Sequence, residues 1–264
     1  MSTADELFRA GDLKGCLAEL QAEVRRRPAD PKLRTFLAQL LMVTGDWDRA
    51  LNQLSVTAEM DASALPMKHT YTAAIQCERL RAAVFAGERS PLVLGDPPPW
   101  IALLLQALVL NGQGRSGEAQ ELRARSLDEA PATAGTMNGS AFEWIADADS
   151  RLGPVLEVLL NGSYYWVPFA RIRRIEFEKP EDARDLVWIP AQFTWSNDGR
   201  AVGLVPVRYP GSEQSGEDTV RLSRKTQWNP LGEGEFTGLG QRVLTTSGAE
   251  FGLLDVRAIT LDGG

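Results

Sequence analysis

The fold is decided by residues 155–169, which read V-L-E-V-L-L-N-G-S-Y-Y-W-V-P-F. Asn161-Gly162 separates two apolar runs, and both residue types tolerate a positive φ, so we expect a two-residue type I′ turn between paired strands. That turn sets a register of three opposed pairs, which are Leu159 and Tyr164, Val158 and Tyr165, and Glu157 and Trp166. The strands then carry large apolar side chains on both faces. Such a hairpin has to be covered on both faces, so we expect it inside the protein.

The segment before this hairpin has the signals of one helix. Ser140 and Glu143 form the pattern of a capping box at a helix start. Gly153-Pro154 ends the pattern, because Gly adopts the left-handed cap conformation and Pro cannot continue a helix. The sequence therefore predicts a helix that begins at Ser140 and opens the second half of the chain.

Composition indicates a globular protein without a nucleic-acid partner. The chain has 264 residues, a net charge of −7, 44% hydrophobic residues and 24% charged residues. A chain of this length can bury a core without disulfides. No Lys/Arg cluster is interleaved with aromatic residues, as a nucleic-acid surface would require. The basic run 25–27 suits the negative end of a helix dipole.

The sequence also predicts a cytoplasmic location. The N-terminus has no basic region followed by an apolar run, so we expect no secretory signal. The most apolar run, residues 100–110, is much shorter than the roughly 20 residues of a membrane span, so no membrane partner is expected. Cys16 and Cys77 lack metal-ligand spacing, and we expect them to be free thiols in a reducing compartment.

Residues 1–131 read as paired helices that repeat. The segment 10–13 (A-G-D-L) matches the segment 44–47 (T-G-D-W) at an offset of 34, and the same offset aligns Cys16 with Ala50. A period of 34 with a tight turn and a small residue at the helix crossing is typical of tetratricopeptide repeats. A looser third unit covers residues 112–131, with Ala119 at the small position, after a long helical stretch over residues 65–86.

Beyond residue 131 the hydrophobic pattern changes from helical spacing to a period of two residues, which is typical of β-strands. This part contains five of the seven tryptophans and has turn signals at 197–199 and 247–248. We expect strands over residues 187–195, 201–208, 242–246 and 251–259. We expect loops over residues 87–99, 211–218 and 230–240.

These patterns together predict an α+β fold with two domains. The first, residues 1–131, is all-α and made of tetratricopeptide-like helical repeats. The second, residues 140–264, is mainly antiparallel β and is opened by one helix. We expect two separate cores joined by a linker over residues 131–139.

Candidate catalytic residues are sparse. His69 is the only histidine and has no evident acid or nucleophile partner in the sequence. Asp147 and Asp149 would point to different sides of the predicted helix, which disfavours a shared metal. Residues 238–242 (G-L-G-Q-R) lack the Lys-Ser/Thr ending of a phosphate-binding loop, so a turn before a strand is favoured. We therefore expect no catalytic, cofactor or metal site.

Aromatic and arginine side chains of the β half are the candidate partner-binding residues. Each could be a core residue, but a domain of this size cannot easily bury all of them, and exposed Trp, Tyr and Arg dominate binding hot spots. For Arg171, Arg173 and Arg174, an equal alternative is that their side chains lie on a solvent-exposed face of a strand. The candidates are Trp144, Tyr164, Tyr165, Trp166, Arg171, Arg173, Trp188, Trp195, Trp228 and Arg242.

Five segments of the second half resemble one protein family. They are F-E-W-I-A-D-A-D-S-R-L-G-P (142–154), Y-Y-W-V-P-F (164–169), R-D-L-V-W-I-P-A (184–191), G-L-V-P-V-R-Y-P-G-S-E (203–213) and G-L-G-Q-R (238–242). In these segments the chain is similar to the ImpE/SciE family of type VI secretion accessory proteins. The resemblance extends over the whole chain, because that family also begins with tetratricopeptide-like helices.

The resemblance implies a non-enzymatic cytoplasmic adaptor. Members bind the N-terminal helical segment of the small contractile-sheath subunit, TssB, and are linked through it to the disassembly ATPase, ClpV. The alternative from the residues is a small-ligand or enzymatic domain in the β half that uses Asp/Glu and Arg. An apolar groove between helices and sheet would favour the adaptor, and a closed pocket with converging carboxylates would favour the enzyme.

Overall fold

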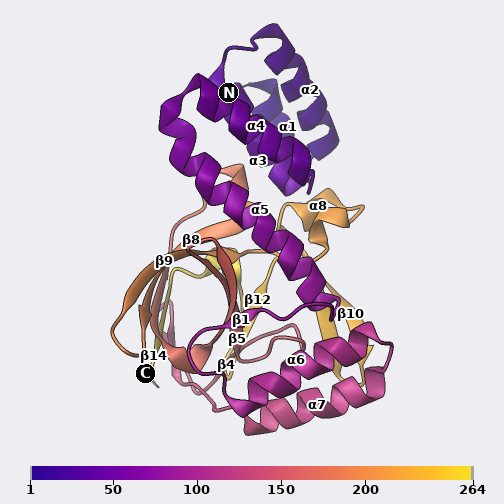
Figure 1. Cartoon of the computed structure of the whole chain (residues 1–264), viewed down its shortest axis with the longest axis vertical. Coiled ribbons are helices and arrows are strands. Elements are labelled where there is room, and N and C mark those ends of the chain that lie inside the picture. Colours follow the sequence, from indigo (N-terminus) through magenta and orange to yellow (C-terminus); the bar gives the residue numbers. More distant parts are fainter. Residues whose placement is uncertain (1, 263–264) are drawn as a thin grey trace.

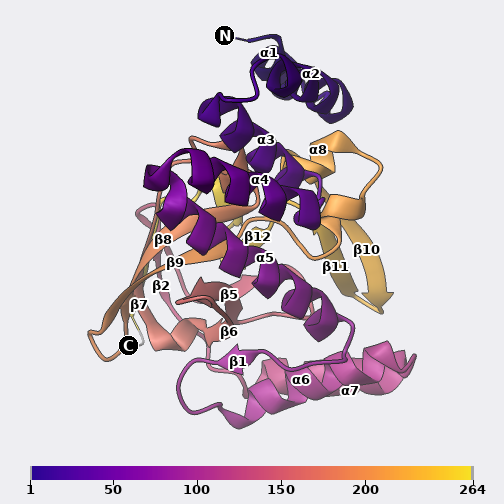
Figure 2. The same ribbon diagram turned by 45° about the horizontal axis from the view of Figure 1, so that its top comes forward.

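The computed structural model describes residues 2–262, with helices first and strands after them (Figure 1). The first two helix pairs lie at one end of the molecule and the last pair at the other, with α5 running between them (Figures 1 and 2). The helices of the first half are α1 (Thr3–Ala10), α2 (Leu13–Arg26), α3 (Pro31–Val43), α4 (Trp47–Met60), α5 (Leu65–Phe85), α6 (Pro99–Gly112) and α7 (Ser116–Glu129). The order of helices followed by antiparallel sheet confirms the predicted α+β class.

The helices pair as the repeat pattern indicates. Gly11 and Gly45 occupy the turns α1–α2 and α3–α4. The three small residues at the predicted crossings, Cys16, Ala50 and Ala119, are fully buried. Small side chains at these positions allow two helices to approach closely. The assignment to the tetratricopeptide class itself stays a prediction.

Nine strands form the main sheet, in the order β1-β6-β5-β9-β8-β7-β14-β2-β3. They are β1 (Leu92–Val93), β2 (Gly135–Met137), β3 (Ser140–Phe142), β5 (Val155–Leu160), β6 (Ser163–Pro168), β7 (Ile172–Phe177), β8 (Trp188–Trp195), β9 (Arg200–Pro206) and β14 (Ala258–Leu261). Every pairing in it is antiparallel except that of β1 with β6.

Two smaller sheets complete the second half. One has the order β13-β12-β4, from β4 (Ile145–Asp147), β12 (Val243–Thr246) and β13 (Glu250–Gly252). The other is the hairpin of β10 (Thr226–Gly232) and β11 (Glu235–Gly240), which is preceded by the short helix α8 (Asp218–Arg221). Among the described residues, no helix combines the length and hydropathy that crossing a bilayer requires.

The β5–β6 hairpin has the predicted register. Asn161 and Gly162 have φ values of 50° and 78°, as a type I′ turn requires. Leu159 pairs with Tyr164, and the two neighbouring predicted pairs are also present. Tyr164 packs in a core shared with the helices, whereas Val158 packs in a second core on the other face of the sheet. The hairpin is therefore covered on both faces, as its composition predicts.

The predicted helix after Ser140 is wrong. This segment forms β3, which pairs with β2, and β4, which pairs with β12. Phe142 is buried in the tight β2–β3 hairpin, whose turn residues Asn138 and Gly139 have φ values of 50° and 86°. Ile145 and Asp147 are buried in β4, whose partner β12 is distant in the sequence. The capping signal of Ser140 and Glu143 is thus overridden by strand pairing, through the local Asn138-Gly139 turn for β3 and through a long-range partner for β4.

The predicted linker and separate cores are also wrong. Residues 135–137 form β2, which pairs with β14 near the C-terminus. One hydrophobic core joins the helices to one face of the main sheet, for example Ile75 and Leu104 with Val155 and Trp188. The division of the chain into domains 1–131 and 140–264 is therefore one of sequence pattern, and independent folding of either part stays a prediction.

Three expected loops and one expected strand also differ from the structure. Residues 92–93 lie in β1, and residues 218–221 form α8. Residues 230–240 lie mostly in the β10–β11 hairpin. The strand expected over 251–259 is divided into β13 and β14 by a helical turn at 253–255. The other predicted strands are present as β8, β9 and β12, with small shifts at their ends.

Candidate functional site

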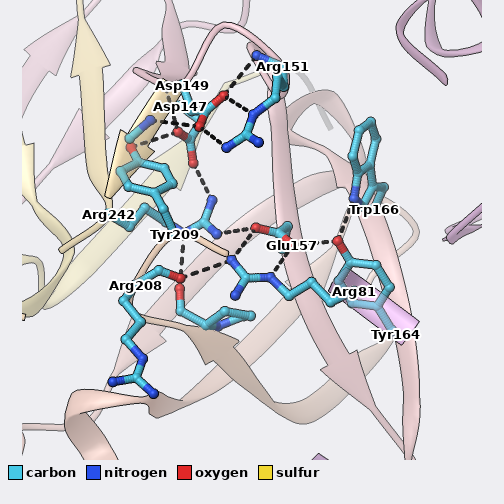
Figure 3. Close-up of polar contacts among 12 residues, drawn as sticks. Arg81, Asp147, Asp149, Arg151, Glu157, Tyr164, Trp166, Arg208, Tyr209 and Arg242 are labelled. Carbon is cyan, nitrogen blue, oxygen red and sulfur yellow. Dashed lines mark hydrogen bonds and ion pairs between the residues drawn. The ribbon is translucent and has the colours of Figure 1, made fainter. Parts of the chain in front are cut away.

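A buried ion-pair network joins α5 to the sheet (Figure 3). The Arg81 guanidinium on α5 donates to both carboxylate oxygens of Glu157 on β5, at 2.6 and 2.8 Å. Arg242 donates to Glu157 from the other side and also to Asp147 on β4. All four side chains are buried. The network therefore connects the helical half, the main sheet and the small β4–β12 sheet through two arginines.

Glu157 is held in its ionised form. Burial opposes its ionisation, but Arg81 and Arg242 outweigh burial and lower its pKa to about 2. The Tyr164 hydroxyl also donates to Glu157, and Trp166 Nε1 donates to that hydroxyl at 2.7 Å. Tyr164 and Trp166 thus support this carboxylate from within the core.

Asp147 has a different electrostatic environment. Burial raises its pKa to about 6, the Arg242 guanidinium partly opposes this rise, and the nearby Asp149 adds to it. Asp147 accepts hydrogen bonds at 2.9 Å from the Tyr209 hydroxyl and from the backbone N–H of Asp149. Two arginines donate to Glu157 and one donates to Asp147, so Asp147 is the carboxylate that is more easily protonated.

The Asp147 and Asp149 pair is not helical, contrary to the prediction. Asp149 is paired with Arg151 at 2.6 Å and accepts a hydrogen bond from the Gly238 backbone at 2.9 Å. Residues 2–262 contain no group of three or more His, Cys, Asp or Glu side chains suited to a metal ion. Each of these carboxylates is thus paired with an arginine in the interior of the protein.

The segment 207–225, between β9 and β10, fixes the first helices to the sheet half. Arg208 donates to the carbonyl oxygens of Val43, at 2.7 Å, and Met42, at 3.1 Å, at the end of α3. Burial lowers the pKa of Arg208 to about 10. Asp218 accepts from the Leu13 backbone N–H at the start of α2, at 3.1 Å. The expected loop 211–218 is therefore part of a clamp that satisfies helix ends.

An open apolar groove lies between α5 and the sheet. We call it the α5 groove; its volume is about 740 Å³, and its walls are one side of α5, the β5–β6 turn and strands β8 and β9. Val202 on β9 is 69% exposed there. A Cβ at Gly203 would lie 2.7 Å from the Leu159 carbonyl oxygen, so glycine is needed where β9 meets β5. The apolar lining includes Met67, Ala74, Leu159, Pro190, Val202 and Leu204.

The polar side chains at this groove are mostly uncharged and include Thr70, Tyr71 and Asn161. His69 is exposed on α5, and Glu178 and Arg184 contribute one charge of each sign. The buried carboxylates Asp147 and Glu157 do not line it. The groove thus has the form expected for apolar recognition, without the converging carboxylates that an enzymatic site would need.

The structure does not gather the ten predicted partner-binding residues into one site. Tyr164, Trp166, Trp188 and Arg242 are fully buried, so their assignment to a partner surface is corrected: they fill the core or the ion-pair network. Tyr165, Arg173 and Trp195 are half-buried. Trp144, Arg171 and Trp228 are exposed and remain predictions. None of the ten lines the α5 groove.

Sequence reasoning missed the α5 groove because it searched for aromatic residues. The available signal was in α5, where apolar residues occur on more than one face, such as Tyr71 and Ala73, which are two residues apart. A helix with this distribution is covered on more than one side or binds a partner. The outward Val202 beside Gly203 on a strand was the second signal.

The remaining predicted motif, Gly238 to Arg242, is structural. Gly238 and Gly240 end β11 against β10, and Arg242 follows directly with its guanidinium in the buried network. The Gly240 backbone N–H donates a hydrogen bond to Ser212 Oγ, at 2.8 Å. The turn predicted over residues 238–242 is wrong, because residues 238–240 lie in β11 and Gln241 forms an isolated β-bridge with Arg208.

The fold and the groove define a class of α+β protein. Its helical half packs on one face of a mainly antiparallel sheet, and an apolar groove between the two stays open. The profile of the family described as ImpE protein matches residues 139–260. The chain is 49% identical over 259 residues to the type VI secretion system accessory component TagJ of Pseudomonas aeruginosa PAO1, covering 98% of this chain and 91% of that protein. The chain therefore belongs to the ImpE family of type VI secretion accessory proteins, which confirms the resemblance.

A solved structure has the same fold over nearly the whole chain. It is the crystal structure of protein VPA1032 from Vibrio parahaemolyticus, with a TM-score of 0.89 and 22% sequence identity. The match covers 98% of this chain and 97% of that one. The helical half and the sheet half thus occur together in the same arrangement in a distant protein.

Proposed function

We propose that this protein is a non-enzymatic cytoplasmic adaptor of a type VI secretion system. It binds the N-terminal helical segment of the small sheath subunit, TssB, in the α5 groove. Through TssB it is linked to sheath assembly and to disassembly by ClpV. Membership of the ImpE family and the name of the Pseudomonas relative support the secretion role.

The observation that carries this proposal is the α5 groove. An amphipathic helix is recognised when its apolar face lies in a hydrophobic groove and its anchor side chains follow helical spacing. The groove offers an apolar wall on α5, with Met67 and Ala74, and a facing wall on β9, with Val202 and Leu204. Glu178 at the groove can pair with a cation on the polar face of such a helix, whereas Arg184 is already paired with Asp182 at 2.6 Å.

The ion-pair network supports the non-enzymatic part of the proposal. A catalytic acid or base has to reach a substrate, with a pKa suited to proton transfer. Glu157 is instead enclosed by two arginines and a tyrosine, and Asp147 by Arg242 and Tyr209. Neither carboxylate faces the α5 groove.

Titration calorimetry with the N-terminal peptide of the cognate small sheath subunit tests the proposal. We expect micromolar affinity, which corresponds to about −8 kcal/mol. Val202→Asp should weaken binding at least tenfold, or by about 1.4 kcal/mol, because a carboxylate would be buried against the apolar face of the peptide. Val109→Asp is the matched control, since Val109 is an exposed valine outside the groove.

Variants of the three exposed residues that were predicted to bind a partner test whether the peptide binds elsewhere. Trp144→Ala, Arg171→Ala and Trp228→Ala should leave the affinity unchanged if the peptide lies in the α5 groove. Loss of binding in any of them, with Val202→Asp binding normally, would move the site to that surface. No heat from the folded protein at high micromolar peptide would reject the adaptor function.

A further inference from the structure

A second groove lies among the N-terminal helices. We call it the N-terminal groove; its volume is about 750 Å³, and its walls are α1, the first half of α3, the end of α4 and residues 181–183 of the sheet half. It shares no lining residue with the α5 groove. It is therefore a separate surface, and what it binds goes beyond the adaptor function proposed above.

The floor of the N-terminal groove is apolar. The Phe8 ring on α1 meets the Phe36 ring on α3 edge to face, with centroids 5.8 Å apart and an interplanar angle of 83°. Leu33 lies one helical turn before Phe36 and also lines the groove. All three side chains are half-buried, so a part of each is open to a partner. This floor can accept one or two apolar side chains.

The rim of the groove is acidic. Its lining includes six carboxylates and four cationic side chains. Arg27 is already paired with Glu23 and Asp30, and Arg224 donates to the carbonyl oxygens of Phe8 and Arg9. Asp61 and Glu181 have no ion-pair partner within residues 2–262, and neither do the cations Arg9 and Lys32. Six carboxylates against four cations leave the lining with a net charge of −2. The rim is therefore complementary to a cationic partner.

One buried polar group points to a ligand independently of charge. Gln39 on α3 lines the groove and is only 6% exposed. Its side-chain amide makes no hydrogen bond to any residue in the described part of the chain, so it is free to bond with a ligand at the groove. An amide has two donors and an acceptor, which match a peptide backbone.

We propose that the N-terminal groove binds a short basic segment of a partner protein. An apolar side chain of that segment packs on Phe8 and Phe36, and its Lys or Arg side chains pair with Asp61 and Glu181. Gln39 hydrogen-bonds to its backbone. The protein then has two partner sites, one apolar beside α5 and one basic-peptide site on the first helices.

The test uses the full-length protein and a fluorescein-labelled five-residue peptide that alternates Lys and Leu, measured by fluorescence anisotropy. Two matched peptides replace Lys by Glu or Leu by Ser. We expect micromolar binding of the Lys/Leu peptide only. Its affinity should fall several-fold between about 0.02 and about 0.3 M NaCl, because salt screens the rim charges. Equal binding of either matched peptide would overturn the inference.

Two variants locate the peptide. Glu181→Lys should weaken binding roughly tenfold, because it reverses an exposed rim charge. Its control, Glu250→Lys, makes the same change at an exposed site outside the groove and should bind normally. Gln39→Met should weaken binding about threefold or more without lowering the melting temperature, since an unbonded amide is replaced by an apolar group of similar size.

The outcomes are distinct from those of the sheath-peptide experiment. Val202→Asp, in the α5 groove, should leave binding of the Lys/Leu peptide unchanged. Binding that Val202→Asp abolishes and Glu181→Lys spares would place the peptide in the α5 groove and overturn the inference. If Gln39→Met binds the Lys/Leu peptide with unchanged affinity, the proposed hydrogen bond between the Gln39 amide and the peptide backbone is overturned.

Discussion

Arg81 is the residue on which the junction of the two halves depends most. Replacing it with Ala leaves Glu157 buried with Arg242 as its remaining cation, and an incompletely paired buried charge is costly. We expect Arg81→Ala to lower the free energy of unfolding by about 3–5 kcal/mol. Arg79→Ala, two residues earlier on α5, breaks an exposed ion pair with Asp48 and should cost less than about 1 kcal/mol. Urea unfolding of both variants measures the difference, and similar losses would contradict this account.

Stability should also depend on pH through Asp147 and Glu157. The folded-state pKa of Asp147, about 6, lies above its ordinary value of 3.8, so the native state holds the proton more tightly and stability falls as pH rises through this window. The pKa of Glu157, about 2, lies below its ordinary 4.5, so its contribution is present above pH 4.5 and is lost as pH falls.

We therefore expect the protein to be more stable near pH 5 than at pH 7. Asp147→Asn should remove much of that difference, because the amide does not titrate. Urea midpoints at the two pH values test this. An undiminished difference in Asp147→Asn would assign the effect to another group.

At the scale of elements, the helix crossings are the tightest contacts of the first half. Ala50 in α4 and Ala119 in α7 are completely buried. Ala50→Leu or Ala119→Leu forces a larger side chain into a packed crossing, and we expect a loss of about 1–3 kcal/mol. The matched control is Ala102→Leu, at an exposed position of α6, which should stay within about 0.5 kcal/mol. Thermal melts compare the three, and unchanged melting of both buried variants would reject the repeat interpretation.

The elements that could be predicted from sequence are those specified locally. The β5–β6 register follows from Asn161-Gly162, and the paired helices follow from their own spacing and turns. The strand β4 could not be predicted, because its partner β12 lies far along the chain. The strand β3 was predictable from Asn138-Gly139, a turn that joins it directly to β2, but the capping signal of Ser140 and Glu143 favoured a helix there instead. The candidate site failed similarly: Trp166 and Trp188 look like recognition residues until the helices that cover them are placed.

For the whole molecule, the shared core predicts that the sheet half does not fold alone. Residues 139–264, which include the span of the family profile, lack Arg81, β1 and β2. Expressed alone, this fragment should show no cooperative melt by circular dichroism, whereas co-expression with residues 1–138 should restore one. A cooperative melt of the isolated fragment would instead support the two-domain division.

Proteolysis of the intact chain gives a second whole-molecule test. Residues 135–137 lie inside the sheet, and the clamp segment 207–225 is bonded to helix ends. Residues 88–90 and 95–97 are exposed. The first cut by a non-specific protease should therefore fall between residues 87 and 97, as mass spectrometry of early fragments would show. A first cut within residues 131–139 would instead support the predicted linker between two separate domains.

The two-residue strand β1 has a consequence for behaviour in concentrated solution. It pairs with Tyr165 and Trp166 and covers the outer side of β6 at one end of the main sheet. An uncovered strand is a template to which another copy of the chain can add. Segment 87–99, which is predicted as a loop from the sequence, thus limits the growth of the sheet at this edge. Shortening it should convert a monodisperse protein into one that forms β-rich aggregates with age, even while its helices and buried charges remain intact.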